Sequence, residues 1–326
     1  MQGEASSDQC AILRVYVGID VCKAWLDVHV HPVGRSLRVP NTGAGWKQLR
    51  RLLREWQVAL VMMEATGKYH RQAHRDLHAH GFAVAIINPL RPRLFAEALG
   101  TLAKNDRIDA KMLAVMGESI APKAVAPCSQ TLEDLQELLR ARQSAVDEAT
   151  ALGNQLGETG NAFLKKQLGI RIRQCKAFIA KLEKELLRLI DSDAAMARRF
   201  EIVQSIPGVG AIAAAWLVIG LSELGACSGK AASLLAGLAP LDDDSADRKG
   251  HRRIRGGRAD VRRGLFMAAI SAVRFNPDQK AFYSRLIAKG KAHKIVVTAV
   301  MRRLVVLANT LLKEDRHWQP TAPNSA

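Results

Sequence analysis

Short apolar runs alternate with amphipathic stretches through the first quarter of the chain. The apolar runs have the length of strands and fall at residues 15–20, 26–30, 37–40, 60–64 and 83–87. Residues 45–56 and 70–80 carry the spacing of amphipathic helices. Three strands in succession, followed by helix, strand, helix and strand, predict an α/β domain with a mixed sheet flanked by helices.

The pattern changes after a linker marked by Pro122 and Pro127. Residues 132–200 have little strand character and are rich in Leu, Ala, Glu, Arg and Lys. Apolar positions recur there at spacings of four and three, as in the seam of a coiled coil or a helical hairpin: Cys175, Ile179, Leu182, Leu186 and Leu189. We expect glycines to break the first helix before the second begins, at Gly153, Gly157, Gly160 and Gly169. The seam also favours a dimer.

A third pattern starts near residue 202, with a Pro-Gly turn, an alanine-rich run and helical periodicity over 260–275 and 294–312. It predicts a mainly α region. We therefore expect an N-terminal α/β domain at 12–125, a helical coiled-coil region at 130–200, a C-terminal domain at 201–314 and a disordered tail at 315–326.

The charge of the chain points to a polyanionic partner. Net charge is +17 with a pI near 10.0, and residues 248–303 hold sixteen Lys and Arg against two acids, or +14 of that total. Nucleic acid is the favoured partner, and an anionic membrane surface is the weaker alternative. The five cysteines form no CxxC pair. The longest apolar stretch, residues 208–221, is shorter than the roughly 18 residues of a spanning helix. We expect a soluble, cytoplasmic protein.

Four carboxylates in the first third of the chain are candidate metal ligands. Asp20 and Glu64 each end an apolar run, where a charge is costly unless it is paired or holds a metal. Asp106 and Asp109 are three residues apart and share one face of a helix, and a solvated helix face is the weaker alternative explanation for this pair. Two Mg²⁺ ions about 4 Å apart neutralise the attacking and leaving oxygens in phosphodiester chemistry. The sequence therefore predicts a metal-dependent enzyme that cuts nucleic-acid backbones, on an RNase H-like fold.

Glycines and basic residues of the third region are candidate nucleic-acid contacts. The turn from Pro207 to Gly210 resembles the hairpin of a helix-hairpin-helix module, whose backbone N–H groups approach a phosphate, although a packing turn between two helices has the same pattern. The predicted contacts are Gly208, Gly210, Arg248, Lys249, Arg252, Arg253, Arg255 and Arg258.

Five blocks in the same order resemble one family, the bridge-RNA-guided DEDD insertion-sequence transposases and recombinases, which also includes the Piv and MooV DNA invertases. The blocks are Gly18-Ile19-Asp20 with Lys23 and Leu26-Asp27-Val28, then Glu64-Ala65-Thr66-Gly67, then residues 106–114, then 206–210, and finally Gly237-Leu238-Ala239-Pro240. The resemblance covers roughly residues 15–312.

The resemblance implies a RuvC-like catalytic domain in which Asp20, Glu64, Asp106 and Asp109 bind Mg²⁺. It implies that Ser245, in the C-terminal transposase domain, is a nucleophile that joins covalently to cut DNA. It also implies a noncoding guide RNA that pairs with donor and target DNA, and a homodimer that pairs into a tetramer. Two departures from the family pattern are Ala246, where glycine usually follows the serine, and three acids at residues 242–244.

Three functions remain open at this level. The first is an RNA-guided DNA transposase with a serine–DNA intermediate. The second is a site-specific DNA invertase or Holliday-junction-type nuclease that uses the same acids without a guide. The third, of another class, is a non-catalytic nucleic-acid-binding scaffold.

Overall fold

The computed structural model describes residues 14–65, 67–100, 106–242 and 252–320; for residues 106 and 107 it describes the helical backbone only. The chain divides into two compact units, residues 1–128 and 129–326. The middle region and the C-terminal region of the predicted division both lie within the second unit.

The first unit is built on a mixed five-stranded sheet in the order β3-β2-β1-β4-β5. Strands β1, β2 and β3 form an antiparallel meander, and β4 and β5 continue the sheet parallel to β1. The strands are β1 (Arg14–Val21), β2 (Trp25–His31), β3 (Arg35–Pro40), β4 (Gln57–Glu64) and β5 (Val84–Ile87). The predicted α/β class and mixed sheet are therefore confirmed for this unit.

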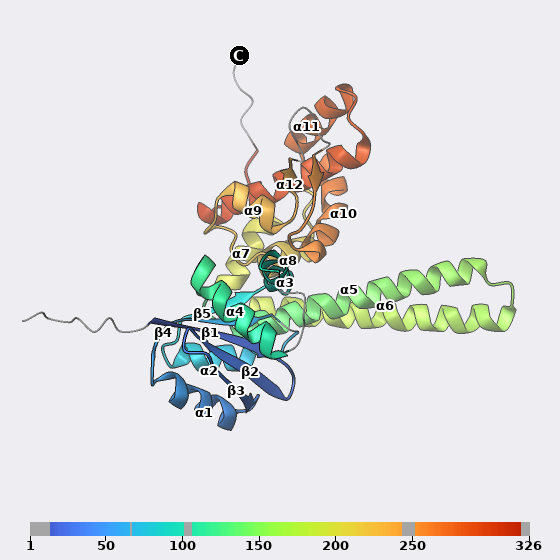
Figure 1. Cartoon of the computed structure of the whole chain (residues 1–326). Coiled ribbons are helices and arrows are strands. Elements are labelled where there is room, and N and C mark those ends of the chain that lie inside the picture. Colours follow the sequence, from blue (N-terminus) through green and yellow to red (C-terminus); the bar gives the residue numbers. More distant parts are fainter. Residues whose placement is uncertain (1–13, 66, 101–105, 243–251, 321–326) are drawn as a thin grey trace, which may run out of the picture. The chain divides into compact units, whose positions relative to one another are not determined.

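Helices cover both faces of the sheet (Figure 1). They are α1 (Gly43–Leu53), α2 (His70–Ala79), α3 (Leu90–Ala98) and α4 (Asp106–Ile120). Leu49 of α1 and Leu77 of α2 are fully buried against one face with Val17 and Ile19 of β1. Leu113 and Met116 of α4 are buried against the other face with Met62 of β4. Since side chains alternate along a strand, β4 and β5 contribute residues to both cores.

The second unit is helical apart from one short β-ladder. Its helices are α5 (Gln130–Glu158), α6 (Ala162–Asp191), α7 (Ala194–Gln204), α8 (Ala211–Gly220), α9 (Gly229–Leu235), α10 (Ala259–Phe275), α11 (Pro277–Ala288) and α12 (His293–Lys313). The ladder pairs β6 (Pro240–Leu241) with β7 (Arg253–Ile254). The N-terminal turns of α5, α6 and α7 are capped by the side chains of Ser129, Asn161 and Asp193, which accept hydrogen bonds from backbone N–H groups.

Helices α5 and α6 form a long antiparallel hairpin (Figure 1). The predicted seam packs within this hairpin, where Leu152 of α5 is buried with Leu168 and Cys175 of α6. At its base, Leu139 and Leu186 join the core of the unit. A helical hairpin thus satisfies the seam, and a coiled coil with a second chain stays a prediction.

The predicted glycine break between the two long helices is wrong for three of the four glycines. Gly160 lies in the turn between α5 and α6, whereas Gly153 and Gly157 lie inside α5 and Gly169 lies inside α6. An internal glycine costs a helix about 1 kcal/mol relative to alanine. Packing along the hairpin seam outweighs that local preference.

Helix α12 is the one described helix long and apolar enough to span a membrane by length and composition. Half of that stretch is buried inside the unit, and Val297, Val300 and Leu304 belong to its core. The sequence pattern favoured residues 208–221 as the longest apolar run because Arg302 and Arg303 interrupt α12.

The segment after α12, which was expected to be disordered, contacts the unit as far as Trp318. The backbone N–H of Trp318 donates to Ser205 Oγ at 2.8 Å, and Arg198 pairs with Asp315 at 3.1 Å.

Candidate active site

Asp20 and Glu64 occupy neighbouring positions on the two central strands of the first unit. The parallel pairing of β1 with β4 runs to Ile19 opposite Met63, so Asp20 and Glu64 form the next step of the same register. Adjacent strands lie about 4.7–4.9 Å apart. Ile19 and Met63 belong to the core on the α1 and α2 face. By alternation, Asp20 and Glu64 project from the opposite face, which α4 covers.

Helix α4 lies directly on the backbone of β1. A Cβ atom added at Gly18 would overlap the carbonyl oxygen of Ala110 and the backbone nitrogen of Ala114. One turn further along α4, a Cβ at Gly117 would meet the side chain of Met62 at 2.9 Å. Gly18 is therefore required here by the close approach of the helix, and Asp20 lies two residues beyond this contact on the same face.

Asp109 belongs to the buried stripe of α4. It lies four residues before Leu113, which is fully buried against the sheet, so both side chains project from the same face of the helix. Asp20, Glu64 and Asp109 are each partly exposed. Asp106 begins α4, and its side chain lies outside the described part of the chain. The fold thus places three predicted ligands on the same face of the first unit's sheet, the face that α4 covers. Two of them stand near the carboxyl ends of β1 and β4.

Oxygen ligands from three carboxylates suit Mg²⁺, which prefers carboxylate oxygens and water. Among the side chains that the structure describes, no group of three or more His, Cys, Asp or Glu lies close enough to hold a metal ion. Asp106 is not among these side chains, because its side chain lies outside the described residues. The metal role of Asp20, Glu64, Asp106 and Asp109 therefore stays a prediction.

A buried ion pair lies beside Asp20 and was not predicted as part of the site. Asp27 stands opposite Asp20 in the β1–β2 register and is 7% exposed. Arg38 of β3 donates to both of its carboxylate oxygens, each at 2.8 Å. The hairpin register that sets Asp27 opposite Arg38 was the available sequence signal. This bidentate pair satisfies a carboxylate that burial would otherwise destabilise.

Two histidines extend this polar stripe along β2. His29 Nδ1 lies 2.8 Å from Ser36 Oγ, and His31 Nε2 lies 2.9 Å from Glu118 Oε2 of α4. Burial, together with the positive charges of Lys111 and His31, lowers the pKa of His29. The surroundings of His29 therefore disfavour its charged form.

In the second unit, Ser245 lies outside the described residues, but the structure describes both ends of the segment that carries it. Pro240 pairs with Ile254, and Leu241 pairs with Arg253. Just outside this ladder, Gly237 and Gly257 approach so closely that a Cβ on Gly257 would overlap the backbone of Gly237. Both have positive φ, at +65° and +61°, which glycine adopts without strain.

Arg262 of α10 fastens the two ends of this segment together. Its guanidinium donates to the carbonyl oxygens of Gly256, at 2.5 Å, and of Ala236, at 3.3 Å. A salt bridge between Arg252 and Asp242 lies across the same stem. The role of Arg262 has no sequence signature, because its partners are the backbone carbonyls of residues remote in the chain.

The predicted basic contacts fall into three groups. Arg248 and Lys249 lie outside the described residues. Arg252, Arg253 and Arg255 are exposed on or beside β7, where Arg252 pairs with Asp242. Arg258 is bound to its own unit, since it donates to Glu223 and to the carbonyl oxygen of Gly220.

The glycine turn before α8 makes two different contacts. Gly208 has φ +93°, and a Cβ there would overlap the backbone of Ala272 in α10. Gly210 caps α8, is exposed and has open space around it. Gly208 therefore serves helix packing, whatever Gly210 contacts.

Comparisons with known proteins match two stretches of the chain. A profile of DEDD transposases of the IS110 type matches residues 17–159, and a profile described as "Transposase IS116/IS110/IS902 family" matches residues 200–284. The chain is 26% identical over 318 residues to the pilin gene-inverting protein of Moraxella bovis, covering 93% of this chain and 97% of that protein. It is 30% identical over 168 residues to an insertion element IS900 protein of Mycobacterium paratuberculosis, covering 45% of this chain and 40% of that protein.

Proposed function

The chain belongs to the IS110-type family of transposases and pilin gene-inverting proteins, and we propose that it cuts and rejoins DNA strands through a serine–DNA intermediate at a Mg²⁺ site. Membership of this family makes it a DNA-processing enzyme. The metal, the nucleophile, the guide RNA and the RuvC-like fold are the parts that we propose.

The observation that carries the proposal is that Asp20, Glu64 and Asp109 lie on the same face of the first unit. Asp20 and Glu64 stand near the carboxyl ends of the adjacent strands β1 and β4, and Asp109 belongs to α4, which packs on that face. Strands and a packed helix hold carboxylates more rigidly than loops do, as a site for a hard cation requires. Asp106, one turn before Asp109 and Ala110, would complete the ligand set.

Mg²⁺ bound by these carboxylates would polarise the scissile phosphate and stabilise negative charge on the departing oxygen. The protein's own residues would set the geometry. Gly18 lets α4 lie against β1, which would bring Asp109 toward Asp20. Arg38 neutralises Asp27, so the carboxylate next to Asp20 is already paired.

Ser245 is the proposed nucleophile. Its Oγ would form a bond to the phosphorus as the bond from phosphorus to a deoxyribose oxygen breaks; the hydroxyl proton leaves, and the departing oxygen takes up a proton. The resulting phosphodiester keeps the bond energy for rejoining. The stem made by the β6–β7 ladder, the Gly237–Gly257 contact and Arg262 supports this role, because it would fix where the serine segment emerges.

A noncoding RNA would supply sequence recognition. Phosphate contacts from a basic surface bind nucleic acid without reading bases, so a guide that pairs with DNA would supply the specificity. The net charge of +14 in residues 248–303 supports a protein that binds the nucleic-acid backbone while a guide RNA reads the sequence. Strand exchange between two DNA sites further favours a homo-oligomer, a dimer that pairs into a tetramer.

A guide-free DNA invertase is the second candidate. The match to a pilin gene-inverting protein over 93% of this chain favours it. The two candidates share the acids and the serine and differ only in the need for RNA.

The test is incubation of the full chain with DNA of its own element, the flanking transcript and Mg²⁺, followed by gel separation of protein–DNA adducts and recombinant joints. We expect adducts from the natural chain, none from Ser245→Ala, and full yield from Ser284→Ala, a control at an exposed serine of α11. An adduct from Ser245→Ala would refute the nucleophile. Recombination without RNA would favour the invertase, and no adduct from any variant would favour a non-catalytic scaffold.

A further inference from the structure

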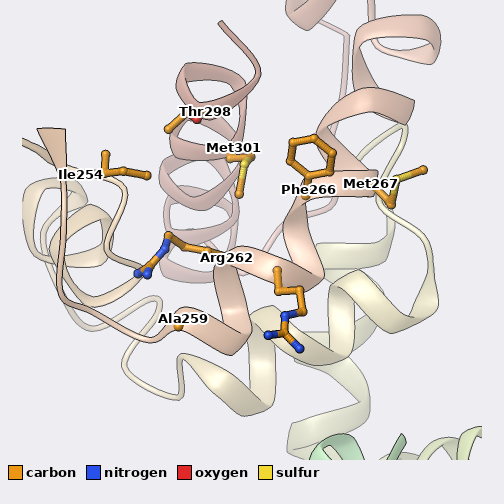
Figure 2. Close-up of a pocket in the computed structure, with 8 residues that line it drawn as sticks. Ile254, Ala259, Arg262, Phe266, Met267, Thr298 and Met301 are labelled. Atoms are coloured by element: carbon orange, nitrogen blue, oxygen red, sulfur yellow. The ribbon is translucent and has the colours of Figure 1, made fainter. Parts of the chain in front are cut away.

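The second unit contains an open apolar pocket beside the stem of the serine segment. Its volume is about 550 Å³, within the range of about 300–1,000 Å³ usual for small-ligand sites. The lining residues come from β7, α10 and α12: Ile254, Ala259, Arg262, Arg263, Phe266, Met267, Thr298 and Met301. Figure 2 shows Ile254, Phe266 and Met301 around the hollow, with Arg262 below them.

The walls of this pocket are apolar and accessible. Phe266 is 40% exposed and Met267 is 66% exposed, although apolar side chains of this size are usually buried. Ile254 of β7 is 39% exposed on the facing side. Such a surface suits a flat, partly apolar group that enters from solvent.

The charge around the pocket is positive. Arg262 and Arg263 are lining residues, and none of the eight is acidic. Lys294 and Arg302 lie one turn before and after Thr298 on α12. Arg263 pairs with Asp147 at 2.7 Å, but both side chains are more than half exposed, and such pairs contribute little. A ligand with an apolar plane and flanking negative charges fits this arrangement.

The number of residues between the pocket and the proposed nucleophile limits the distance between them. Ile254 pairs with Pro240, and Leu241 follows in the same ladder. Ser245 is four residues beyond Leu241, and four residues span at most about 14 Å. A base within the first few nucleotides from a joined phosphate can therefore reach the pocket.

We propose that this pocket binds one unstacked nucleobase of the single strand next to the cleavage point, with the flanking phosphate on Arg263. An aromatic ring stacks against any base, and arginine supplies the backbone contact. A base still paired in a duplex cannot enter, so the pocket selects a locally melted strand. Thr298 Oγ1 donates to Lys294 O at 2.8 Å, which leaves its lone pairs to accept from a base N–H group. This inference rests on the proposed function, since it assigns the pocket to the same reaction.

The first test measures binding of the full chain to a fluorescein-labelled single-stranded oligonucleotide and to its abasic counterpart, in EDTA so that no cleavage occurs. We expect the abasic strand to bind about five- to 150-fold more weakly, the range of one stacking contact. Phe266→Ala should abolish this preference. Phe275→Ala removes an exposed phenylalanine from the same helix, outside the pocket, and should keep the preference.

Two further measurements separate the base from its phosphate. Arg263→Gln should lower the slope of log Kd against log salt by about 0.7, as the loss of one phosphate contact does for single strands, whereas Phe266→Ala should leave it unchanged. Photocrosslinking of a 5-iodouracil oligonucleotide should modify the α10 peptide that contains Phe266.

Equal affinity of the natural chain for the intact and the abasic oligonucleotide would overturn the inference. A Phe266→Ala variant that keeps the natural preference for the intact oligonucleotide would also overturn it. A Phe266→Ala variant that loses self-association in sedimentation while its DNA binding is unchanged would also overturn it, since the pocket would then receive protein. Asp20→Asn should bind the single strand normally while failing to form adducts. Failure of the base pocket is therefore distinguishable from failure of the proposed chemistry.

Discussion

The backbone of Gly18 lies against the backbone of Ala110, so helix α4 rests on strand β1 with no side chain between them. This contact places the N-terminal turn of α4 beside the end of β1. A glycine two residues before Asp20 therefore allows α4, which carries Asp109, to approach the strand that carries Asp20.

The Gly18 contact predicts a loss of both stability and activity on substitution. In Gly18→Ala, the new methyl group would overlap Ala110 and Ala114 and push α4 from the sheet. Overpacking of this kind costs about 1–3 kcal/mol. Urea denaturation should show that loss, and adduct formation should fall with it. Gly43→Ala, at a helical glycine with open space around it, should change neither quantity.

The Asp27–Arg38 pair should be worth more than exposed ion pairs on the same strand. Arg38→Gln leaves a buried carboxylate without its bidentate donor, and we expect a loss of about 1–2 kcal/mol, because Arg38 is itself half exposed. A double-mutant cycle with Asp27→Asn measures the coupling. Arg35→Gln, which breaks the exposed pair with Glu55, should cost at most about 0.5 kcal/mol. A coupling energy near zero would show that Asp27 does not depend on Arg38.

The two glycines of the turn before α8 should respond differently to alanine. Gly208→Ala would have a positive φ and overlap the backbone of Ala272, so we expect a loss of at least about 2 kcal/mol. Gly210→Ala should leave thermal stability unchanged. If Gly210→Ala also leaves DNA affinity unchanged, the predicted phosphate contact of this turn is wrong.

The Glu223–Arg258 pair predicts a pH dependence of stability. Burial raises the pKa of Glu223, but hydrogen bonding and charge pairing with Arg258 outweigh burial and lower the pKa overall. A carboxyl whose folded pKa is depressed stabilises the fold above its unfolded pKa, and this contribution is lost as pH falls through the folded value.

Arg258→Gln should therefore lower the free energy of unfolding at pH 7 by about 1 kcal/mol at most, since both side chains are more than a third exposed. The difference in free energy of unfolding from the natural chain should shrink as pH falls through the depressed folded pKa of Glu223. Chemical denaturation over a pH series from pH 7 into the acid range measures it. A loss that stays constant across the series would show that the charge pair is not the cause.

Local pattern was sufficient to predict the first unit. Apolar residues define strands β1, β2 and β4. The carboxylates of Asp20 and Glu64, which follow apolar runs, mark where β1 and β4 become partly exposed. Helical spacing predicted that Asp106 and Asp109 share one face of a helix; α4 confirms the helix, and the shared face stays a prediction because the side chain of Asp106 lies outside the described residues. These features depend on residues close together in the chain, where periodicity carries the information.

Contacts between distant segments could not be predicted. Arg262 binds the carbonyls of Ala236 and Gly256, which have no side-chain signature, and the pocket at Phe266 depends on how α10 packs beside α12 and β7. The helix break predicted at the internal glycines of α5 and α6 is wrong, because packing along the hairpin outweighs the low helix propensity of glycine. The pairing of Asp27 with Arg38 depends on the register of the β2–β3 hairpin, which the sequence pattern does not specify.

The most direct test of the central claim, that Asp20, Glu64 and Asp109 hold one metal site, is a Mn²⁺ titration followed by electron paramagnetic resonance. Mn²⁺ takes the same oxygen ligands as Mg²⁺. We predict that Asp20→Asn, Glu64→Gln and Asp109→Asn each weaken Mn²⁺ binding at least about tenfold, whereas Asp134→Asn, at an exposed acid of α5, leaves it unchanged. Mn²⁺ affinity that is the same in all four variants as in the natural chain would contradict the account.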